Sequence, residues 1–374
     1  MSELNNQANK PNDDNVLLRV ENLSQHFGDL KAFDNISFDI KKGEVFGLVG
    51  ESGCGKTTTG RSIIKLYNIT SGSIYFKGKR IGAGTLSYKN AIKDAKKKFK
   101  EDIDALNNGN DPEKNEKAAK LKEDLKHFIA EQKKQIASAK YDNSHVDKDL
   151  ITQIQMIFQD PIASLDPRMT VREIISEGLV IKGVKDKKEI DEKVYQVLET
   201  VGLVREHAGR YPHEFSGGQR QRIGVARSVI MRPELIIADE PVSALDVSIQ
   251  AQVINLLNDL RHDLGITILF VAHDLSVVKY FSDRIGVMYF GKMVELADSD
   301  ELFRHPLHPY TRSLLSAIPL PDPDYEKNRK RLTYVPLRDH DYSVEQPTFR
   351  EVAHNHFVLC SDSEEAKYKE IIGG

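Results

Sequence analysis

Residues 50–57 read Gly-Glu-Ser-Gly-Cys-Gly-Lys-Thr, a spacing typical of loops that bind phosphate groups. The three glycines allow a tight backbone bend, so that successive N–H groups can point at an anion. Lys56 offers a positive charge to the β- and γ-phosphates of a nucleotide, and the Thr57 hydroxyl is expected to ligate Mg²⁺. The expected nucleotide-binding residues of this segment are Gly50, Glu51, Ser52, Gly53, Cys54, Gly55, Lys56, Thr57 and Thr58.

The segments on either side of this loop support a phosphate site. An apolar run at 45–49 is typical of a buried strand, and residues 58–66 read as a helix whose N-terminus faces the anion. A glycine-rich turn that matches the pattern by chance is the alternative. The succession of strand, loop and helix favours the phosphate-binding interpretation.

An acidic pair follows a second apolar run, at 235–238. Asp239 is placed to hold Mg²⁺, usually through water. Glu240 stands where a carboxylate could polarise an attacking water molecule. Taken alone, the pair could be a solvated strand end. The phosphate-binding segment upstream favours a catalytic role.

A further glycine-rich segment, Ser216-Gly217-Gly218-Gln219, precedes a run at 219–231 that can be helical. The N-terminus of a helix attracts anions through its free N–H groups and its dipole. This segment lies far along the chain from the first loop, so the two segments of one chain are not expected to bind the same phosphate group. A second subunit resolves the difficulty, because the first loop of one chain and this segment of another can enclose one ATP. The alternative is a plain helix cap.

With these motifs in this order, residues 17–298 resemble the nucleotide-binding subunits of ABC transporters. The resemblance implies that Phe27 stacks on adenine and that Gln159 contacts both Mg²⁺ and a transmembrane partner. It also implies that His273 senses the γ-phosphate. By themselves, these three residues could be a core or edge aromatic, a polar strand end and a core histidine.

The same resemblance assigns the remaining motifs. The signature motif that acts on the partner's ATP is Ser216, Gly217, Gly218 and Gln219, preceded by Phe215 where Leu is commoner. The D-loop is Ser243, Ala244, Leu245 and Asp246. The implied catalytic residues are Lys56, Glu240 and His273, and the implied Mg²⁺ ligands are Thr57, Gln159 and Asp239.

Three longer stretches, at 158–171, 211–215 and 305–319, narrow the resemblance to the ATPases of oligopeptide and dipeptide permeases, and to their F-type subunit. That family implies a heterodimer with a second ABC ATPase, two transmembrane permease subunits and an extracytoplasmic peptide-binding protein. Importers of nickel, glutathione or other solutes use similar ATPases, so they remain an alternative. A soluble ABC ATPase of DNA repair or translation, or a degenerate regulatory subunit, fits these motifs less well.

The amino-acid composition limits the kinds of binding partner and the cellular compartment that fit this chain. The 374-residue chain has a net charge of −3, which gives no general electrostatic reason to bind nucleic acid. Cys54 and Cys360 are too few for a disulfide framework and fit a reducing compartment. No apolar run approaches the roughly 20 residues of a membrane-spanning helix. We expect a peripheral protein on the cytoplasmic face of the cell membrane, attached through its partners.

The predicted fold is α/β, an ABC-type P-loop NTPase domain with an antiparallel β subdomain and a mainly parallel core sheet. Residues 1–15 are expected to be a disordered tail and 16–299 the ATP-binding domain. Within that domain, 82–150 form an inserted helical hairpin and 160–228 the helical subdomain that carries the signature. Residues 300–374 form a C-terminal accessory region.

The insertion departs from the family pattern. Two sets of apolar residues at helical spacing flank a turn, with Asp111 as the expected cap and Pro112 as the first residue of the second helix. The sets are Ile92, Ala95, Phe99, Ile103 and Leu106, then Ala118, Leu121, Leu125, Phe128 and Ile136. Lysines at 96–100 could bind RNA or anionic lipid, but their mixture with acidic residues favours a solvated helix face.

The C-terminal region contains several prolines, which predict loops and short helices docked on the core. His354, His356 and Cys360 could be metal ligands, although their spacing matches no tetrahedral site well. A single cysteine in this region excludes an iron–sulfur cluster held by four of its cysteines.

Overall fold

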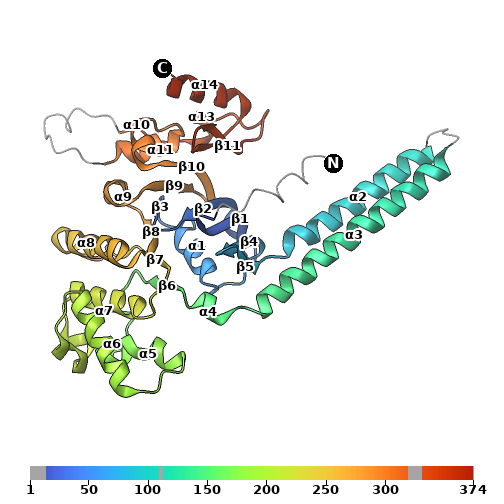
Figure 1. Ribbon diagram of the computed structural model, residues 1–374. Helices are drawn as coiled ribbons and strands as arrows, with labels where there is room; N and C mark the ends of the chain where they lie inside the picture. Colours follow the sequence, from blue (N-terminus) through green and yellow to red (C-terminus); the bar gives the residue numbers. More distant parts are fainter. Residues whose placement is uncertain (1–13, 109–112, 319–330, 374) are drawn as a thin grey trace.

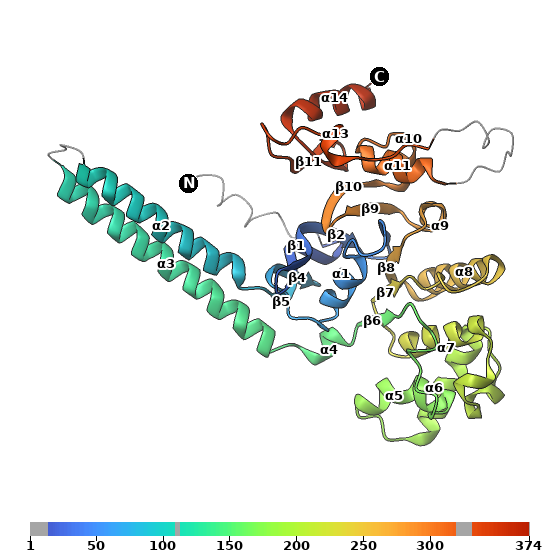
Figure 2. The same ribbon diagram turned by 180° about the vertical axis from the view of Figure 1, so that it is seen from behind.

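The computed structural model describes residues 14–108, 113–318 and 331–373. Its core contains two sheets, and a long helical hairpin projects away from them (Figures 1 and 2). The predicted tail at 1–15 lies almost entirely outside the described residues, as do Asp111 and Pro112. Among the described helices, none combines the length and apolar character needed to cross a membrane.

The larger sheet has eight strands in the order β11-β12-β10-β9-β3-β8-β7-β6. The strands from β9 to β6 are parallel, and β10, β12 and β11 continue the sheet with antiparallel pairing. Every residue of β3, β7 and β8 is buried, which fits sequences that are apolar except for Asp239 at the end of β7 and Thr267 at the start of β8. The strands are β3 Val45–Val49, β6 Ile154–Ile157, β7 Leu235–Asp239, β8 Thr267–Ala272, β9 Arg284–Tyr289, β10 Lys292–Asp298, β11 Thr348–Ala353 and β12 His356–Cys360.

The smaller sheet is antiparallel, as the sequence predicts, and its strand order is β2-β1-β4-β5. It consists of β1 Val16–Phe27, β2 Leu30–Lys41, β4 Ser71–Phe76 and β5 Lys79–Ala83. Helix α1, Lys56–Ile63, contacts β1 and β2 of this sheet and also β7 and β8 of the larger one. The helix after the phosphate-binding loop is therefore packed between the two sheets.

Alternation along the strands divides the core into two layers. In β3, Val45 and Val49 pack with the helices, whereas Phe46 and Leu48 pack with the antiparallel sheet. The helices in the layer that contains Val45 and Val49 are α5 Val171–Ile181, α6 Lys187–Thr200, α7 Gly217–Val229, α8 Val247–Leu264 and α9 Leu275–Phe281. Two 3₁₀ turns, η1 Arg205–Gly209 and η2 Pro212–Glu214, precede α7, so residues 160–228 are largely helical as predicted.

The insertion is a hairpin of α2, Leu86–Asn108, and α3, Lys114–Ser144, and it confirms the helices predicted from apolar spacing (Figure 1). Its seam is only half-buried, and Ala139 is its one fully buried residue within the described part. The base of the hairpin is fixed to β5, since the Asn143 amide donates to the Ala83 carbonyl at 2.7 Å and accepts its N–H at 3.1 Å. Arg80 also pairs with Asp142. Helix α4, Lys148–Ile151, leads back to β6.

The prediction of loops and short helices for the C-terminal region was wrong in one respect. The helices are present as α10 Ser299–Arg304, α11 Pro309–Ser316, α13 Pro336–Asp339 and α14 Asp362–Gly373. However, β11 and β12 also add two strands to the core sheet. The prolines lie before these strands, and β12 alternates buried and half-buried residues as an edge hairpin does.

A buried carboxylate holds the C-terminal region on the sheet. Glu295 of β10 is fully buried and accepts the backbone N–H groups of Leu307, at 2.8 Å, and His308, at 3.0 Å. It also pairs with the Nε2 atom of His356, 2.9 Å away. His308 in turn caps α11 by accepting the Tyr310 N–H at Nδ1. Burial, assisted by the charges of His340 and Arg312, lowers the pKa of His308 to about 3.

The low pKa of His308 predicts that acid destabilises the protein. An unfolded histidine takes up a proton near pH 6.5, whereas folded His308 does so only near pH 3. Its contribution to stability is therefore complete above pH 6.5 and falls by about 1.4 kcal/mol per pH unit below it. His308→Asn keeps a capping side chain and removes the titration. Thermal unfolding between about pH 7.5 and about pH 5.5 should show a smaller loss for this variant than for the wild type. Equal losses would contradict the assignment.

Candidate functional site

The phosphate-binding loop connects the end of β3 to the start of α1 and adopts a conformation that only glycine fits at two places. Gly50 has φ 151° and Gly55 has φ 103°. A Cβ atom would lie 2.2 Å from the Met288 carbonyl oxygen at Gly50 and 2.5 Å from the Ala32 carbonyl oxygen at Gly55. Backbone atoms of neighbouring segments therefore pack closely against the loop at both glycines. Because glycine has no side chain, the loop accepts this close packing and still presents its N–H groups as a cradle for an anion.

The Lys56 side chain is folded back into this loop. Its ammonium donates to the carbonyl oxygens of Gly50, at 2.7 Å, and Glu51, at 2.9 Å. The residue is 4% exposed. The positive charge is thus held inside the cradle, where it can turn from backbone carbonyls to an anion bound by the loop.

Thr57 and Asp239 meet beside the loop. The Thr57 hydroxyl donates to Asp239 Oδ1 at 2.7 Å. Asp239 is fully buried, and among the described residues its Oδ2 atom has no hydrogen-bond partner. Burial raises the pKa of this carboxyl. A hydroxyl beside a buried carboxylate oxygen with free lone pairs is a donor set that suits a hard cation such as Mg²⁺.

Three polar side chains converge at the ends of adjacent parallel strands. Glu240, directly after β7, accepts a hydrogen bond from the Gln159 amide at 3.1 Å, and the same oxygen lies 3.1 Å from Nδ1 of His273. Gln159 follows β6 and His273 follows β8. The carboxyl ends of parallel strands share one edge of a sheet, so the topology brings these side chains together.

Phe27 lies at the end of β1 with 44% of its surface exposed. Its ring packs edge-on against Tyr67, with centroids 5.2 Å apart. An exposed aromatic ring can receive a planar base on its free face. Tyr67 was not among the expected site residues, because nothing in its local sequence marks it.

The signature and D-loop residues form adjacent helix caps. Ser216 caps α7 by accepting the Gln219 N–H, and Gln219 accepts the Ser216 N–H in return. Asp246 caps α8 by accepting the Ile249 N–H at 3.0 Å. The two caps are neighbours, since a Cβ on Gly217 would touch Leu245. The capping interpretation of the signature is therefore correct as local structure, and it leaves the glycine N–H groups of the first turn available.

One contact at the loop comes from a region that sequence reasoning did not connect with it. The Tyr310 hydroxyl, in α11, accepts the backbone N–H of Glu51 at 3.0 Å. The sequence around Tyr310 contributes to the family resemblance, but no local pattern relates it to the phosphate-binding loop.

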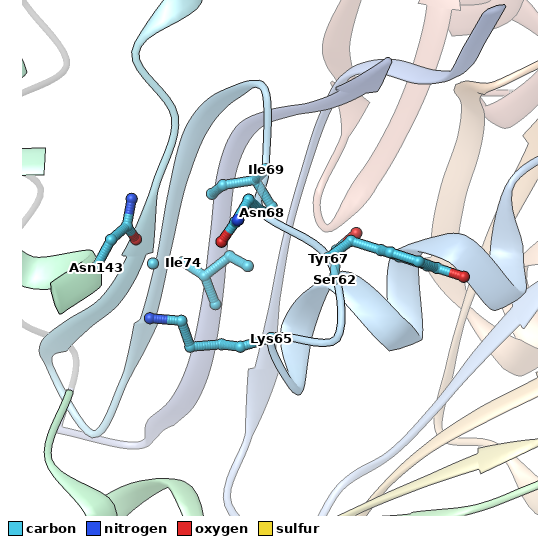
Figure 3. Close-up of a pocket in the computed structure, with 8 residues that line it drawn as sticks. Ser62, Lys65, Tyr67, Asn68, Ile69, Ile74 and Asn143 are labelled. Carbon is cyan, nitrogen blue, oxygen red and sulfur yellow. The ribbon is translucent and has the colours of Figure 1, made fainter. Parts of the chain in front are cut away.

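A small hollow with a volume of about 10 Å³, close to what a single water molecule needs, lies at the other end of α1 (Figure 3). It is lined by Ser62, Lys65, Tyr67, Asn68, Ile69, Ile74, Gly82 and Asn143. Ligand pockets usually exceed about 300 Å³, so the hollow is too small for a nucleotide. It marks the junction between α1 and the base of the hairpin, and burial lowers the pKa of the Lys65 ammonium there.

The alternative metal site in the C-terminal region finds no support in the described residues. His354, His356 and Cys360 do not form a cluster of potential ligands. His356 is fully buried and pairs with Glu295 instead.

Comparison with known proteins identifies two family regions. Residues 33–145 and 125–243 match the family described as "ABC transporter". Residues 294–342 match "Oligopeptide/dipeptide transporter, C-terminal region". Tyr310 and Glu295 both lie within the second region.

Relatives match almost the whole chain. The oligopeptide transport ATP-binding protein OppF of Bacillus subtilis is 52% identical over 353 residues, which cover 93% of this chain and 97% of the relative. The oligopeptide transport ATP-binding protein AmiF of Streptococcus pneumoniae is 44% identical over 359 residues, covering 95% and 98%.

Among solved structures, the dimeric bacterial ABC transporter cassette MJ0796 matches with a TM-score of 0.54 at 23% identity. The match covers 76% of this chain and 99% of that one. CbiO1 of Clostridium perfringens matches with a TM-score of 0.55, covering 78% and 92%. These likenesses concern the fold alone. The two family regions and the relatives that match almost the whole chain show that it belongs to the ABC transporter ATP-binding proteins, in the oligopeptide/dipeptide transport branch of that family.

Proposed function

We propose that this protein binds and hydrolyses ATP to power an importer of oligopeptides or dipeptides. The observation that carries the proposal is the convergence of Thr57, Asp239, Glu240, Gln159 and His273 beside a phosphate-binding loop. The relatives named for oligopeptide transport support the choice of cargo.

Binding would use the whole cradle. Apart from those of Glu51 and Cys54, which already have hydrogen-bond acceptors, the N–H groups of the loop and of the N-terminus of α1 would face the phosphates, and Lys56 would supply positive charge. The exposed ring of Phe27 stacks on adenine. Thr57, the free Oδ2 of Asp239 and Gln159 hold Mg²⁺, directly or through water. When bound, this ion neutralises charge on the β- and γ-phosphates.

Hydrolysis would depend on Glu240. Its carboxylate accepts a proton from, or polarises, the attacking water molecule. The Gln159 amide and the His273 ring hold one of its oxygens, which fixes the direction of the other. His273 is about half exposed, so it can also reach the γ-phosphate. Positioning and charge stabilisation supply most of the catalysis in phosphoryl transfer.

Each ATP would be enclosed by two chains. Helix α7 lies in the helical subdomain, away from α1 (Figures 1 and 2), and no hydrogen bond joins residues 216–219 to the phosphate-binding loop in the described structure. We therefore assign the N–H groups of Gly217 and Gly218 to the ATP of a second ABC ATPase. The D-loop, 243–246, lies beside them at the same interface.

The remaining partners follow from the transport function. Two transmembrane permease subunits receive the movement of the helical subdomain through the segment after Gln159, and an extracytoplasmic peptide-binding protein delivers cargo to them. The protein then works at the cytoplasmic face of the cell membrane and binds no nucleic acid.

Lys56→Ala tests the phosphate-binding loop. A charge-assisted hydrogen bond contributes about 1.5–3 kcal/mol, so ATP affinity should fall about 10-fold or more. Titration of the purified chain with a fluorescent ATP analogue measures this loss. Lys42→Ala, which removes an exposed lysine outside the loop, is the control. Unchanged affinity in Lys56→Ala would count against the site.

Glu240→Gln tests the catalytic carboxylate. The amide keeps the shape of the side chain but cannot act as a base, so turnover should fall by about 10²-fold or more while ATP remains bound. Steady-state hydrolysis and retained nucleotide are measured in the assembled complex. Glu234→Gln changes a surface carboxylate at the other end of β7 and should hydrolyse ATP normally. Normal hydrolysis by Glu240→Gln would refute the role.

Purification of the tagged chain from its native membrane in mild detergent tests the assembly. We expect two multispanning proteins and a second ATPase, with an associated binding protein that indicates the cargo. A binding protein for nickel or glutathione would reassign the substrate. Ribosomal or DNA-processing proteins without membrane subunits would overturn the transport function.

A further inference from the structure

We propose that Tyr310, from the C-terminal region, is a positioning residue of the phosphate-binding loop, and that its hydroxyl holds the Gly50–Glu51 peptide in the orientation that nucleotide binding needs. The proposal rests on the ATP-binding function assigned to this loop. It adds a role for the C-terminal region in the nucleotide site.

The peptide between Gly50 and Glu51 is held at both ends. Its carbonyl oxygen accepts a hydrogen bond from the Lys56 ammonium at 2.7 Å, and its N–H donates to the Tyr310 hydroxyl at 3.0 Å. When Lys56 turns towards a bound phosphate, the carbonyl loses that donor. The bond to Tyr310 then remains to hold the peptide plane.

The loop needs an anchor at this position because it begins with glycine. Gly50 has φ 151°, and a Cβ atom there would lie 2.2 Å from the Met288 carbonyl oxygen. Only glycine can occupy the position, yet glycine has the fewest steric restraints on its own backbone. The orientation of the following peptide therefore depends on an outside partner, and Tyr310 supplies one.

Tyr310 is itself firmly placed. It is 2% exposed, and its ring packs against Tyr289, with centroids 4.3 Å apart, and Tyr334, 5.7 Å apart. Its backbone N–H donates to His308, whose own N–H donates to the buried Glu295. A continuous set of hydrogen bonds, buried up to Tyr310, thus connects β10 with the first residues of the loop. Burial also raises the pKa of Tyr310, so the hydroxyl stays neutral and can accept the Glu51 N–H.

This arrangement makes nucleotide affinity depend on how the C-terminal region is docked. Any displacement of α11 from β10 would move the Tyr310 hydroxyl away from Glu51. The Glu51 N–H would then lose its hydrogen bond to Tyr310, which is the only side-chain contact to this N–H among the described residues.

Tyr310→Phe in the full-length chain tests the proposal, because it removes the hydroxyl and keeps the ring. Tyr334→Phe is the matched control, since this ring belongs to the same cluster and its hydroxyl makes no hydrogen bond to a described residue. The first measurement is amide hydrogen exchange at Glu51 without nucleotide. The second is the Kd for a fluorescent ATP analogue. The third is the KM and kcat of ATP hydrolysis in the assembled complex.

We expect Tyr310→Phe to speed exchange at Glu51 and to raise both Kd and KM about 2- to 10-fold, with kcat nearly unchanged. Tyr334→Phe should change none of these values. If Tyr310→Phe showed the same amide exchange at Glu51 and the same affinity for the ATP analogue as the wild type, the proposal would be overturned. Equal effects of both variants would also overturn it, because they would assign the role to ring packing. If the wild-type chain bound no ATP, the proposed function would fail, while the exchange at Glu51 would still decide whether Tyr310 holds the loop.

Discussion

Complete burial of the parallel strands β3, β7 and β8 is the constraint on which the rest of the structure depends. Strands covered on both faces can carry polar groups only where they end. Their carboxyl ends lie along one edge of the sheet, so the loop after β3, the acidic pair after β7 and the histidine after β8 must be neighbours. The core thereby concentrates the chemistry at a single edge.

That edge contains groups that an ordinary core would avoid. Asp239 is fully buried with one oxygen unpaired in the described structure, and Glu240 has φ 45° although it is not glycine. Such underpaired and strained residues are characteristic of functional sites, where the surrounding fold maintains them. Here the two sheets and α1 packed between them provide the rigid surroundings.

The two additions to the core approach α1 from opposite ends. The hairpin is fixed by Asn143 and Asp142 to β5, beside the hollow at the end of α1 (Figure 3). The C-terminal region approaches the start of α1 through Tyr310. The hairpin depends on directed polar contacts at its base, because its seam is only half-buried. The C-terminal region is held in addition by the pairing of β12 with β10 and by buried side chains such as Leu302 and Tyr310.

The sequence by itself determined the parts of the structure that local patterns encode. Glycine spacing at 50–55, the apolar runs before Gly50 and Asp239, and the helical spacing around Phe99 and Leu125 predicted the loop, the buried strands and the hairpin. Only the tertiary structure decided that β11 and β12 extend the core sheet and that Tyr67 meets Phe27. It alone also placed Tyr310 against Glu51, which is 259 positions away in the chain. Periodicity reports what a segment does with its own neighbours, whereas contacts between distant segments arise from packing of the whole chain and leave no local pattern.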